Sequence, residues 1–264
     1  MKEKLLFFDI DGTLIECKLG IFDIPDTTTK SLQALQKLGH RTFLATDRAK
    51  CFIVDGVMKY PFDGYVTCNG AHVEYEGKTI YKEVISKEAL QVTHEYCIKH
   101  NMVYYFEGNK KIYTPSKNNP THIDFAERWI MKDKVVEDNY DISSIEAHIG
   151  MIVVNSKEQI EDMKKTLSPY FDVQRHHSEY SFDLTLKGVS KAVGIEKLTE
   201  AIHKDIKDTI AFGDGYNDLE MLETVGLGIA MGNGADEAKD ASNYVTSRIE
   251  EDGITKALEH FSLI

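Results

Sequence analysis

The chain has 264 residues and a formal net charge of −12 at neutral pH, with 42% hydrophobic and 28% charged residues. This composition is that of an ordinary globular protein, and the acidic balance argues against a broad nucleic-acid footprint. No apolar run approaches the length of a membrane span, and the first residues lack the features of a signal peptide, so we expect a cytoplasmic protein that binds neither nucleic acid nor membrane. The four cysteines are widely spaced, which favours reduced thiols over a zinc site or a disulfide framework.

The stretch 5–13 is an apolar run that leads directly into two carboxylates. Two leucines followed by two phenylalanines are typical of a strand that is buried on both faces, as in a parallel sheet. The Asp-Gly pair that follows predicts a turn, so Asp9 and Asp11 come at the carboxyl end of this strand. Side chains two residues apart in extended backbone point the same way, and ligands of open α/β sheets bind at this edge. Because an Asp-Gly turn alone is common, the rest of the chain must decide between a turn and a site.

The next part of the chain alternates strand, helix and strand patterns. Leucines at helical spacing are followed by a glycine stop, and two β-type runs precede a hairpin that turns at Glu76-Gly77. The predicted elements are a helix over 28–38, strands over 41–45 and 64–67, and a hairpin over 72–82. Such alternation predicts a single parallel sheet with right-handed crossovers.

From about residue 83 to residue 186 the pattern changes to that of an α+β insert. The expected elements are a helix over 86–99, a hairpin of strands over 102–107 and 111–114, a helix over 120–131, a loop over 132–144, a strand over 145–154, a helix over 157–167, and strands over 171–174 and 181–186. They predict a small, mostly antiparallel sheet with helices. Aromatic residues favour half-buried strands and helices, so we expect Tyr104, Tyr105, Phe106 and Trp129 in the core of this insert.

At about residue 188 the α/β rhythm returns. The expected elements are a helix over 191–202 capped by Ser190, a strand over 209–212, a helix over 219–224, a strand over 228–231, a helix over 235–241, a strand over 244–246 and a helix over 250–261. The predicted fold class is therefore α/β, with a doubly wound, mostly parallel, Rossmann-like core sheet and an inserted α+β cap domain. We expect the core to comprise 1–82 and 187–264, and the cap domain to comprise 83–186.

Three predicted strand ends carry acidic or polar side chains, and one lysine opens the helix after the insert. These residues are Asp9 and Asp11, Thr46 and Asp47, Asp214, Asn217 and Asp218, and finally Lys191. Carboxylates gathered at one edge repel one another unless a cation holds them, and oxygen ligands without His or Cys fit Mg²⁺ best. Such a pocket favours a phosphate, where one Asp can act as nucleophile and a second as general acid and base.

The order Asp9-x-Asp11-x-Thr13, Thr46, Lys191 and Gly213-Asp214-x-x-Asn217-Asp218 resembles the haloacid dehalogenase superfamily of phosphatases. The large insert between the second and third motifs resembles the layout of its Cof-type branch. The resemblance implies a Mg²⁺-dependent phosphatase that hydrolyses small phosphomonoesters, such as sugar phosphates, through an aspartyl-phosphate intermediate.

Carried over position by position, the resemblance implies that Asp9 is the nucleophile and Asp11 the general acid and base. Mg²⁺ would be held by the carboxylates of Asp9 and Asp214 and by the backbone carbonyl of Asp11, with Asp218 supporting the metal shell through water. The phosphate would be held by Thr46, Lys191 and Asn217 and by the backbone at Ile10 and Asp47. Thr13 would close the loop after the nucleophile.

Three positions leave alternatives open. The second motif of the family commonly reads Thr-Gly-Arg, whereas here Asp47 stands in place of the glycine. Its carboxylate either lies near the expected phosphate site or caps the next turn. Lys187 competes with Lys191 for the role of the family's lysine, although that lysine follows Gly-Val-Ser. Asn217 can cap the helix that follows it as well as bind phosphate.

Two other functions remain compatible with these residues. A phosphomutase of the same fold would use Asp9 in the same way but pass the phosphoryl group to a sugar hydroxyl. A non-catalytic phospholigand-binding protein would keep the pocket and lose the nucleophile or the acid, whereas both aspartates are present here. In each case the partner is a small-molecule phosphate ester, and the sequence indicates no particular oligomeric state.

Overall fold

The computed structural model describes residues 2–128, 135–175 and 180–264, and the chain divides into two compact units. The core unit comprises Met1–Asp47, Ile53–Tyr81 and Ser190–Ile264, and the insert unit comprises Arg48–Phe52 and Lys82–Val189. The segment Arg48–Phe52 thus groups with the insert unit, which the sequence pattern did not indicate. Among the described residues, no helix combines the length and the apolar character needed to cross a membrane.

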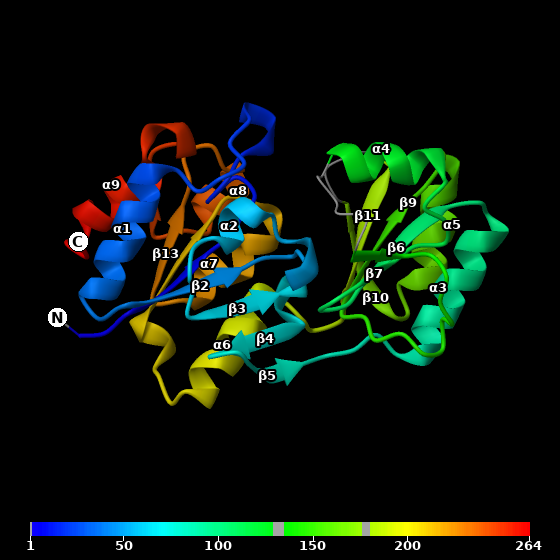
Figure 1. Cartoon of the computed structure of the whole chain (residues 1–264), viewed down its shortest axis with the longest axis horizontal. Coiled ribbons are helices and arrows are strands. Elements are labelled where there is room, and N and C mark those ends of the chain that lie inside the picture. Colours follow the sequence, from blue (N-terminus) through cyan, green and yellow to red (C-terminus); the bar gives the residue numbers. More distant parts are fainter. Residues whose placement is uncertain (1, 129–134, 176–179) are drawn as a thin grey trace. The chain divides into compact units, whose positions relative to one another are not determined.

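The core unit is built on an eight-stranded sheet of order β14-β13-β12-β1-β2-β3-β4-β5 (Figure 1). The strands are β1 (Leu5–Phe8), β2 (Arg41–Ala45), β3 (Gly64–Thr67), β4 (His72–Tyr75), β5 (Lys78–Lys82), β12 (Thr209–Gly213), β13 (Leu227–Ala230) and β14 (Tyr244–Val245). The pairings from β14 to β3 are parallel and the β3–β4 pairing is antiparallel. The carboxyl ends of β2, β1 and β12 therefore meet at one edge, which confirms the predicted fold class.

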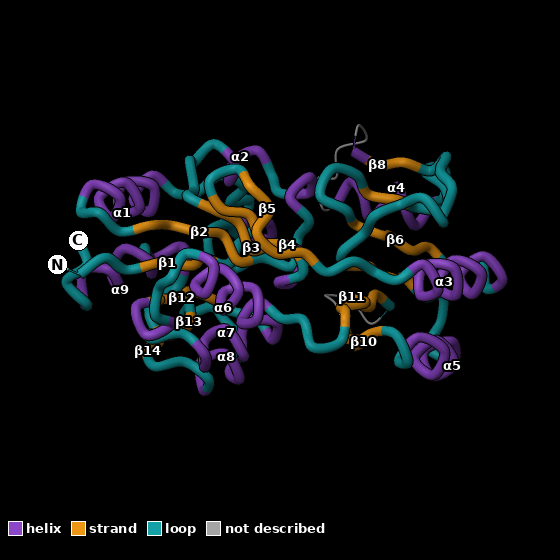
Figure 2. Tube along the Cα trace, turned by 90° about the horizontal axis from the view of Figure 1, so that it is seen from below, coloured by secondary structure: helices purple, strands orange, loops and turns teal. Residues whose placement is uncertain are grey.

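Helices cover both faces of this sheet (Figure 2). One face carries α1 (Asp26–Lys37), α2 (Asp55–Met58) and α9 (Gly253–His260), and the other carries α6 (Lys191–Ala201), α7 (Leu219–Thr224) and α8 (Asp236–Asp240). Successive strand residues alternate between the two layers, so Leu6 and Phe8 of β1 pack in the cluster on the α1 side while Leu5 and Phe7 pack on the α6 side. This is why β1 is apolar throughout, and the sheet is doubly wound.

The insert unit has a six-stranded, mostly antiparallel sheet of order β10-β11-β9-β6-β7-β8. Its elements are α3 (Lys87–Lys99), β6 (Val103–Glu107), β7 (Ile112–Tyr113), α4 (Pro120–Arg128), β8 (Val136–Glu137), β9 (Ile149–Val153), α5 (Glu158–Leu167), β10 (Phe171–Arg175) and β11 (Ser181–Leu186). Tyr104 and Phe106 of β6 pack on the side of α3 and α5, and Tyr105 packs with Phe125 of α4 on the other side. These three β6 aromatics are buried as expected, whereas Trp129 and the predicted helix end near residue 131 lie outside the described residues.

Several boundaries differ from the sequence prediction. The strand predicted over 145–154 is confined to Ile149–Val153, and two further differences have a visible structural cause. The predicted loop over 132–144 contains the short strand β8, because Val136 pairs in parallel with Ile112 at the edge of the sheet. The last helix begins at Gly253 instead of residue 250, since Asp252 adopts a left-handed conformation with φ 59°. A separate 3₁₀ turn, Ile249–Glu251, precedes it. The left-handed residue interrupts the helical backbone, and a polar pattern alone does not reveal it.

Candidate active site

Lys191 buries an ammonium group among carboxylates at the carboxyl end of β1. Its Nζ lies 2.6 Å from Oδ1 of Asp9 and 2.7 Å from Oδ1 of Asp218. The side chain of Lys191 has no exposed surface, and Asp9 and Asp218 are also buried. Asp9 continues the alternation of Leu5 and Phe7 toward the α6 side, where Lys191 occupies the first turn. Because a buried charge is tolerated only when it is paired, these three residues form one electrostatic unit.

Asp218 also closes the turn that follows β12. Its Oδ2 accepts hydrogen bonds from the backbone amides of Asp214 at 2.8 Å and Gly215 at 2.9 Å, while its Oδ1 accepts from Lys191. The expectation that Asn217 caps the following helix is wrong, because the N-cap residue of α7 is Asp218 and its side chain makes no capping hydrogen bond to that helix. The Asp218 carboxylate instead reaches back to the amides of the preceding turn. Asn217 is half-buried, and its side chain makes no hydrogen bond within the described residues.

Asp214 packs directly on the loop that follows β1. The Thr13 hydroxyl donates a hydrogen bond of 3.0 Å to Oδ1 of Asp214, so Thr13 links two loops in addition to any role in its own. Gly12 has φ 89°, and a Cβ at this position would lie 2.1 Å from Oδ2 of Asp214. Only glycine allows both this backbone conformation and this close approach. The loop bearing Asp11 is therefore in van der Waals contact with the carboxylate of Asp214.

The carboxylates of Asp9, Asp214 and Asp218 each place an oxygen within 4.8 Å of the others. Burial raises the pKa of Asp9, and the charges of Asp218 and Asp214 raise it further, although Lys191 acts in the opposite direction. Burial, together with Asp218, raises the pKa of Asp214 to about 7. Burial alone would lower the pKa of Lys191, but the charges of Asp218 and Asp9 outweigh it and raise that pKa. The cluster therefore has more negative charge than one ammonium can balance.

This donor set fits a hard divalent cation. Lys191 and backbone amides occupy the oxygens of Asp218, whereas the second oxygens of Asp9 and Asp214 receive no hydrogen bond from a described residue. Asp9 and Asp214 are therefore the two carboxylates available to a metal, and oxygen ligands of this kind suit Mg²⁺. A cation here would relieve the repulsion that raises the pKa values of both groups.

The remaining predicted residues lie around this cluster. Thr46 is fully buried at the end of β2, and its Oγ1 lies 3.3 Å from Oδ1 of Asp47. Asp47 is half-buried, and its charge contributes to the raised pKa of both Asp9 and Lys191. The substituted position of the second motif thus contributes negative charge to the site. Asp11 is half-buried, and its charge adds to the raised pKa of Asp214. Ile10 is fully buried, and only its backbone can reach a ligand.

Sequence reasoning missed two asparagines near this edge. Asn69 follows β3 with φ 52° and is buried, and its Oδ1 has no hydrogen-bond partner among the residues that the structure describes. Its backbone amide donates to the carbonyl of Thr46 at 3.0 Å. Asn233 follows β13, and its Nδ2 donates to the carbonyl of Gly12 at 2.7 Å. Both lie after predicted strands, and an Asn at that position was the available signal, although it indicates a turn equally well.

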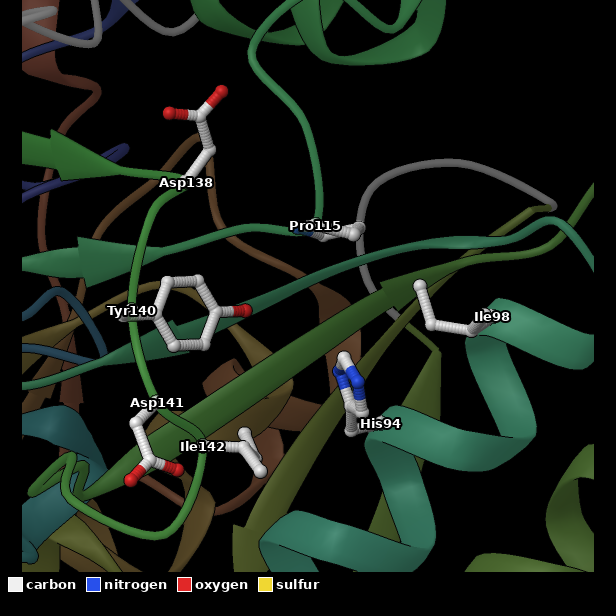
Figure 3. Close-up of a pocket in the computed structure, with 7 residues that line it drawn as sticks. All are labelled: His94, Ile98, Pro115, Asp138, Tyr140, Asp141 and Ile142. Atoms are coloured by element: carbon white, nitrogen blue, oxygen red, sulfur yellow. The ribbon is translucent and has the colours of Figure 1, made fainter.

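The insert unit contains a separate cavity of about 290 Å³ (Figure 3). None of the predicted site residues lines it. Its lining consists of His94, Ile98, Pro115, Asp138, Tyr140, Asp141 and Ile142. Behind it, Nδ1 of His94 lies 2.7 Å from the hydroxyl of Tyr104, which in turn hydrogen-bonds to the hydroxyl of Tyr140. The cavity is thus bordered by hydrogen-bonded aromatic side chains, by aliphatic side chains and by the carboxylates of Asp138 and Asp141, and no lysine or arginine is among the described residues that line it.

Comparison with known proteins gives a consistent result. A family model described as haloacid dehalogenase-like hydrolase matches residues 6–258. The "Putative phosphatase YkrA" of Bacillus subtilis is 33% identical over 266 residues, which cover all of both chains. The 5-amino-6-(5-phospho-D-ribitylamino)uracil phosphatase YitU of the same organism is 27% identical over 289 residues, with 99% of each chain covered.

Solved structures agree over the whole chain. The HAD subclass IIB sugar phosphatase BT4131 superimposes with a TM-score of 0.86 at 30% identity, covering 99% of this chain and 100% of the other. A protein from Geobacillus kaustophilus superimposes with a TM-score of 0.88 at 30% identity, and both chains are fully covered.

Proposed function

The chain belongs to the haloacid dehalogenase-like hydrolases, as a phosphatase of their Cof-type branch, and we propose that it uses Mg²⁺ and an aspartyl-phosphate intermediate to hydrolyse small phosphomonoesters. The observation that carries this proposal is the buried Lys191 ammonium bridging Asp9 and Asp218, with the Asp214 carboxylate beside them. A buried ion pair is weak evidence of stability. The desolvation cost of this ion pair is explained if a nucleophile and an anion-binding group must be held together for catalysis.

The residues of the site suit the two half-reactions. A carboxylate oxygen of Asp9 attacks phosphorus, the ester P–O bond breaks, and Asp11 gives its proton to the leaving oxygen. Asp11 then takes a proton from water, whose oxygen attacks phosphorus and releases Asp9 as a carboxylate. Lys191, the Thr46 hydroxyl, the Asn217 amide and the backbone amides at Ile10 and Asp47 bind the phosphoryl oxygens.

The Mg²⁺ ion that Asp9, Asp214 and the backbone carbonyl of Asp11 would hold supplies positive charge beside the phosphoryl oxygens. Asp218 fixes Lys191 and the turn after β12, and so supports the metal ligands from behind. The support of the metal shell through water that the sequence resemblance implied for Asp218 stays a prediction.

We infer that the substrates carry the phosphate on a polyhydroxylated carbon chain. Two relatives support this class, because BT4131 is described as a sugar phosphatase and YitU as acting on a phosphorylated ribityl compound. We propose that the insert unit acts as the cap domain and selects among such esters, since the groups with catalytic roles lie in the core unit. The four cysteines form no disulfide, which supports a reducing cytosolic location.

The proposal is tested by a screen of phosphate esters with Mg²⁺ in ¹⁸O-labelled water, measuring inorganic phosphate and its label. We expect release of phosphate carrying ¹⁸O, with sugar monophosphates among the best substrates. An isomeric sugar phosphate that accumulates without labelled phosphate would instead identify a phosphomutase. The absence of turnover on every ester would contradict both enzymes and leave a phospholigand-binding protein.

A further inference from the structure

We propose that Asn233 is a positioning residue for phosphoryl transfer, which holds the loop bearing Asp11 in register with the loop bearing Asp214. The proposal rests on the proposed phosphatase function. Asn233 itself touches neither carboxylate. It acts through the backbone of Gly12, and it belongs to none of the motifs identified in the sequence.

The side chain of Asn233 bridges two distant parts of the core unit. Its Nδ2 donates to the carbonyl oxygen of Gly12 at 2.7 Å, and its Oδ1 accepts from the backbone amide of Ile249 at 3.0 Å. Both ends of the amide are therefore used, and their chemistry fixes its orientation, because a donor must face the carbonyl and an acceptor must face the amide. The bridge attaches the loop after β1 to the turn that precedes α9.

The turn that contains Asn233 also contacts Asp214. The backbone amide of Ala235 donates to the carbonyl of Asp214 at 2.8 Å. A Cβ on Gly234 would lie 2.9 Å from the Cα of Asp214, and a Cβ on Gly12 would lie 2.1 Å from its Oδ2. Asp214 is thus enclosed between two glycines, one on the Asp11 loop and one on the Asn233 turn. A shift of either loop would change the position of its carboxylate.

The loop after β1 has little else to fix the Gly12 carbonyl. The loop closes on itself, since the amides of Leu14 and Ile15 donate to the carbonyl of Ile10, and the amide of Gly12 donates to the carbonyl of Ile15. These bonds set its internal shape. Within the described part of the chain, two side-chain hydrogen bonds hold the loop against the rest of the core, one from the Thr13 hydroxyl to Asp214 and one from Asn233 to the Gly12 carbonyl. Because a misplacement of about 1 Å can cost about 10²-fold in rate, this single amide can influence turnover.

The test compares two substitutions of Asn233 with a matched control. Asn233→Asp keeps the acceptor for Ile249 but replaces the donor to Gly12 by a carboxylate oxygen, and Asn233→Ala removes both bonds. Asn243 is the control, because its Oδ1 accepts from the backbone amide of Gly228 at 2.7 Å at the opposite end of β13. Asn243→Ala therefore removes one side-chain hydrogen bond near the same strand without touching the site.

We expect kcat to fall about 10- to 100-fold in both Asn233 variants, with KM within about twofold of the wild type. Asn243→Ala should lower the unfolding temperature but leave kcat unchanged. Hydrogen exchange provides a readout that is independent of activity. The amides of 12–15 should exchange faster in Asn233→Asp than in the wild type or in Asn243→Ala.

The possible outcomes separate the two proposals. If the wild type is active and both Asn233 variants keep its kcat and its exchange pattern, the positioning role is wrong and the phosphatase function stands. If the wild type hydrolyses no ester, the phosphatase function fails, while hydrogen exchange still decides whether Asn233 holds the loop. If Asn233→Ala does not fold, the isosteric Asn233→Asp decides alone.

Discussion

The two units bury polar groups in different ways. The core unit buries formal charges, with the Lys191 ammonium between Asp9 and Asp218. In the insert unit, the buried hydroxyl of Tyr104 lies between His94 and Tyr140, where burial raises the pKa of Tyr140 to about 12 and that of Tyr104 further. These phenols therefore stay neutral at physiological pH. The insert unit also buries the charged side chains of Arg48 and Glu107. Arg48 donates to the carbonyl of Phe52 at 3.2 Å, and Glu107 accepts a hydrogen bond of 3.3 Å from the amide of Ala49.

We infer from this difference that the charged cluster of the core unit serves catalysis, whereas the hydroxyl chain of the insert unit serves stability. A buried ion pair costs desolvation energy that its attraction barely offsets, so a structural role alone explains it poorly. A neutral hydroxyl chain rigidifies a unit at less cost, because no charge leaves water. We therefore expect substitutions in the charged cluster to act on turnover, and substitutions in the neutral chain to act on stability.

The largest effect should come from Asp9→Asn. An amide cannot attack phosphorus, so kcat should fall more than about 10⁴-fold. The fold should persist, because the amide oxygen can still accept from Lys191 and one repelling carboxylate is gone. Phosphate release measures the activity, and thermal unfolding measures the fold. A variant that keeps more than about a hundredth of the wild-type rate, in a preparation free of wild-type enzyme, would remove Asp9 from the role of nucleophile.

Lys191→Met should affect both turnover and stability. Loss of the ammonium removes a contact to the phosphoryl group, so kcat should fall about 10²- to 10³-fold. It also leaves Asp9 and Asp218 buried without their partner, at a cost of about 3–5 kcal/mol. The matched control is Lys187→Met, because Lys187 is the exposed rival from the sequence. Unchanged activity in Lys191→Met, or an equal loss in Lys187→Met, would reverse our assignment.

Asp214 should make the stability of the metal-free protein depend on pH. Its pKa is about 7 in the folded protein against an ordinary 3.8, so over this interval the folded state holds a proton that the unfolded chain has released. The stability from this proton is complete below pH 3.8 and is lost as the pH rises toward 7.

In EDTA, the contribution of Asp214 to the free energy of unfolding should therefore fall between these two pH values, as measured by thermal unfolding. Mg²⁺ should stabilise the protein more at pH 8 than at pH 5, because protons compete with the ion for Asp214. Asp214→Asn should weaken both effects and leave the part due to Asp9, whose pKa burial also raises. Asp240→Asn, which removes one exposed carboxylate on α8, should leave both effects unchanged. A Mg²⁺ stabilisation that is equal at both pH values would argue against binding at Asp214.

Exchange of the insert unit with that of a relative should change the order of preferred substrates but keep the Mg²⁺ requirement. The structure refines the design, because Arg48–Phe52 belongs to the insert unit through the contacts of Ala49 with Glu107 and of Cys51 with Gly108. A chimera that exchanges 48–52 together with 82–189 should be more stable than one that exchanges 82–189 alone. An unchanged order of substrates in both chimeras would place specificity in the core unit, with Asp47 the first candidate.

The sequence predicted most of the fold because its signals are local. The apolar run of β1, the leucine spacing of α1 and the Ser190 cap of α6 each specify an element without distant contacts. The carboxylate cluster followed, because parallel strands bring their carboxyl ends to one edge.

What sequence reasoning missed depends on contacts between distant residues. Asn233 and Gly12 meet only after the sheet has formed, and their sequence separation of 221 residues hides the hydrogen bond. The attachment of Arg48–Phe52 to the insert unit likewise depends on tertiary packing. The Asp218 carboxylate binds Lys191 and the backbone amides of the turn after β12, and nothing local in the sequence distinguishes it in this from the neighbouring Asn217.

The smallest expected effect, and the sharpest test of the contrast between the units, is Tyr104→Phe. The change deletes the hydroxyl that joins His94 to Tyr140 and leaves the ring in place. Loss of such hydrogen bonds costs about 1–2 kcal/mol, and the low end applies here because both partners line the cavity and water there can replace the lost hydroxyl (Figure 3).

Tyr170→Phe is the control, since its hydroxyl donates to exposed Glu88 at 2.8 Å and its removal should change stability by less than about 0.5 kcal/mol. Both variants should keep kcat within about twofold of the wild type, because neither Tyr104 nor Tyr170 belongs to the charged cluster. A large loss of kcat in Tyr104→Phe with normal unfolding would show that the neutral chain of the insert unit takes part in turnover, and the separation of chemistry from scaffolding would then fail.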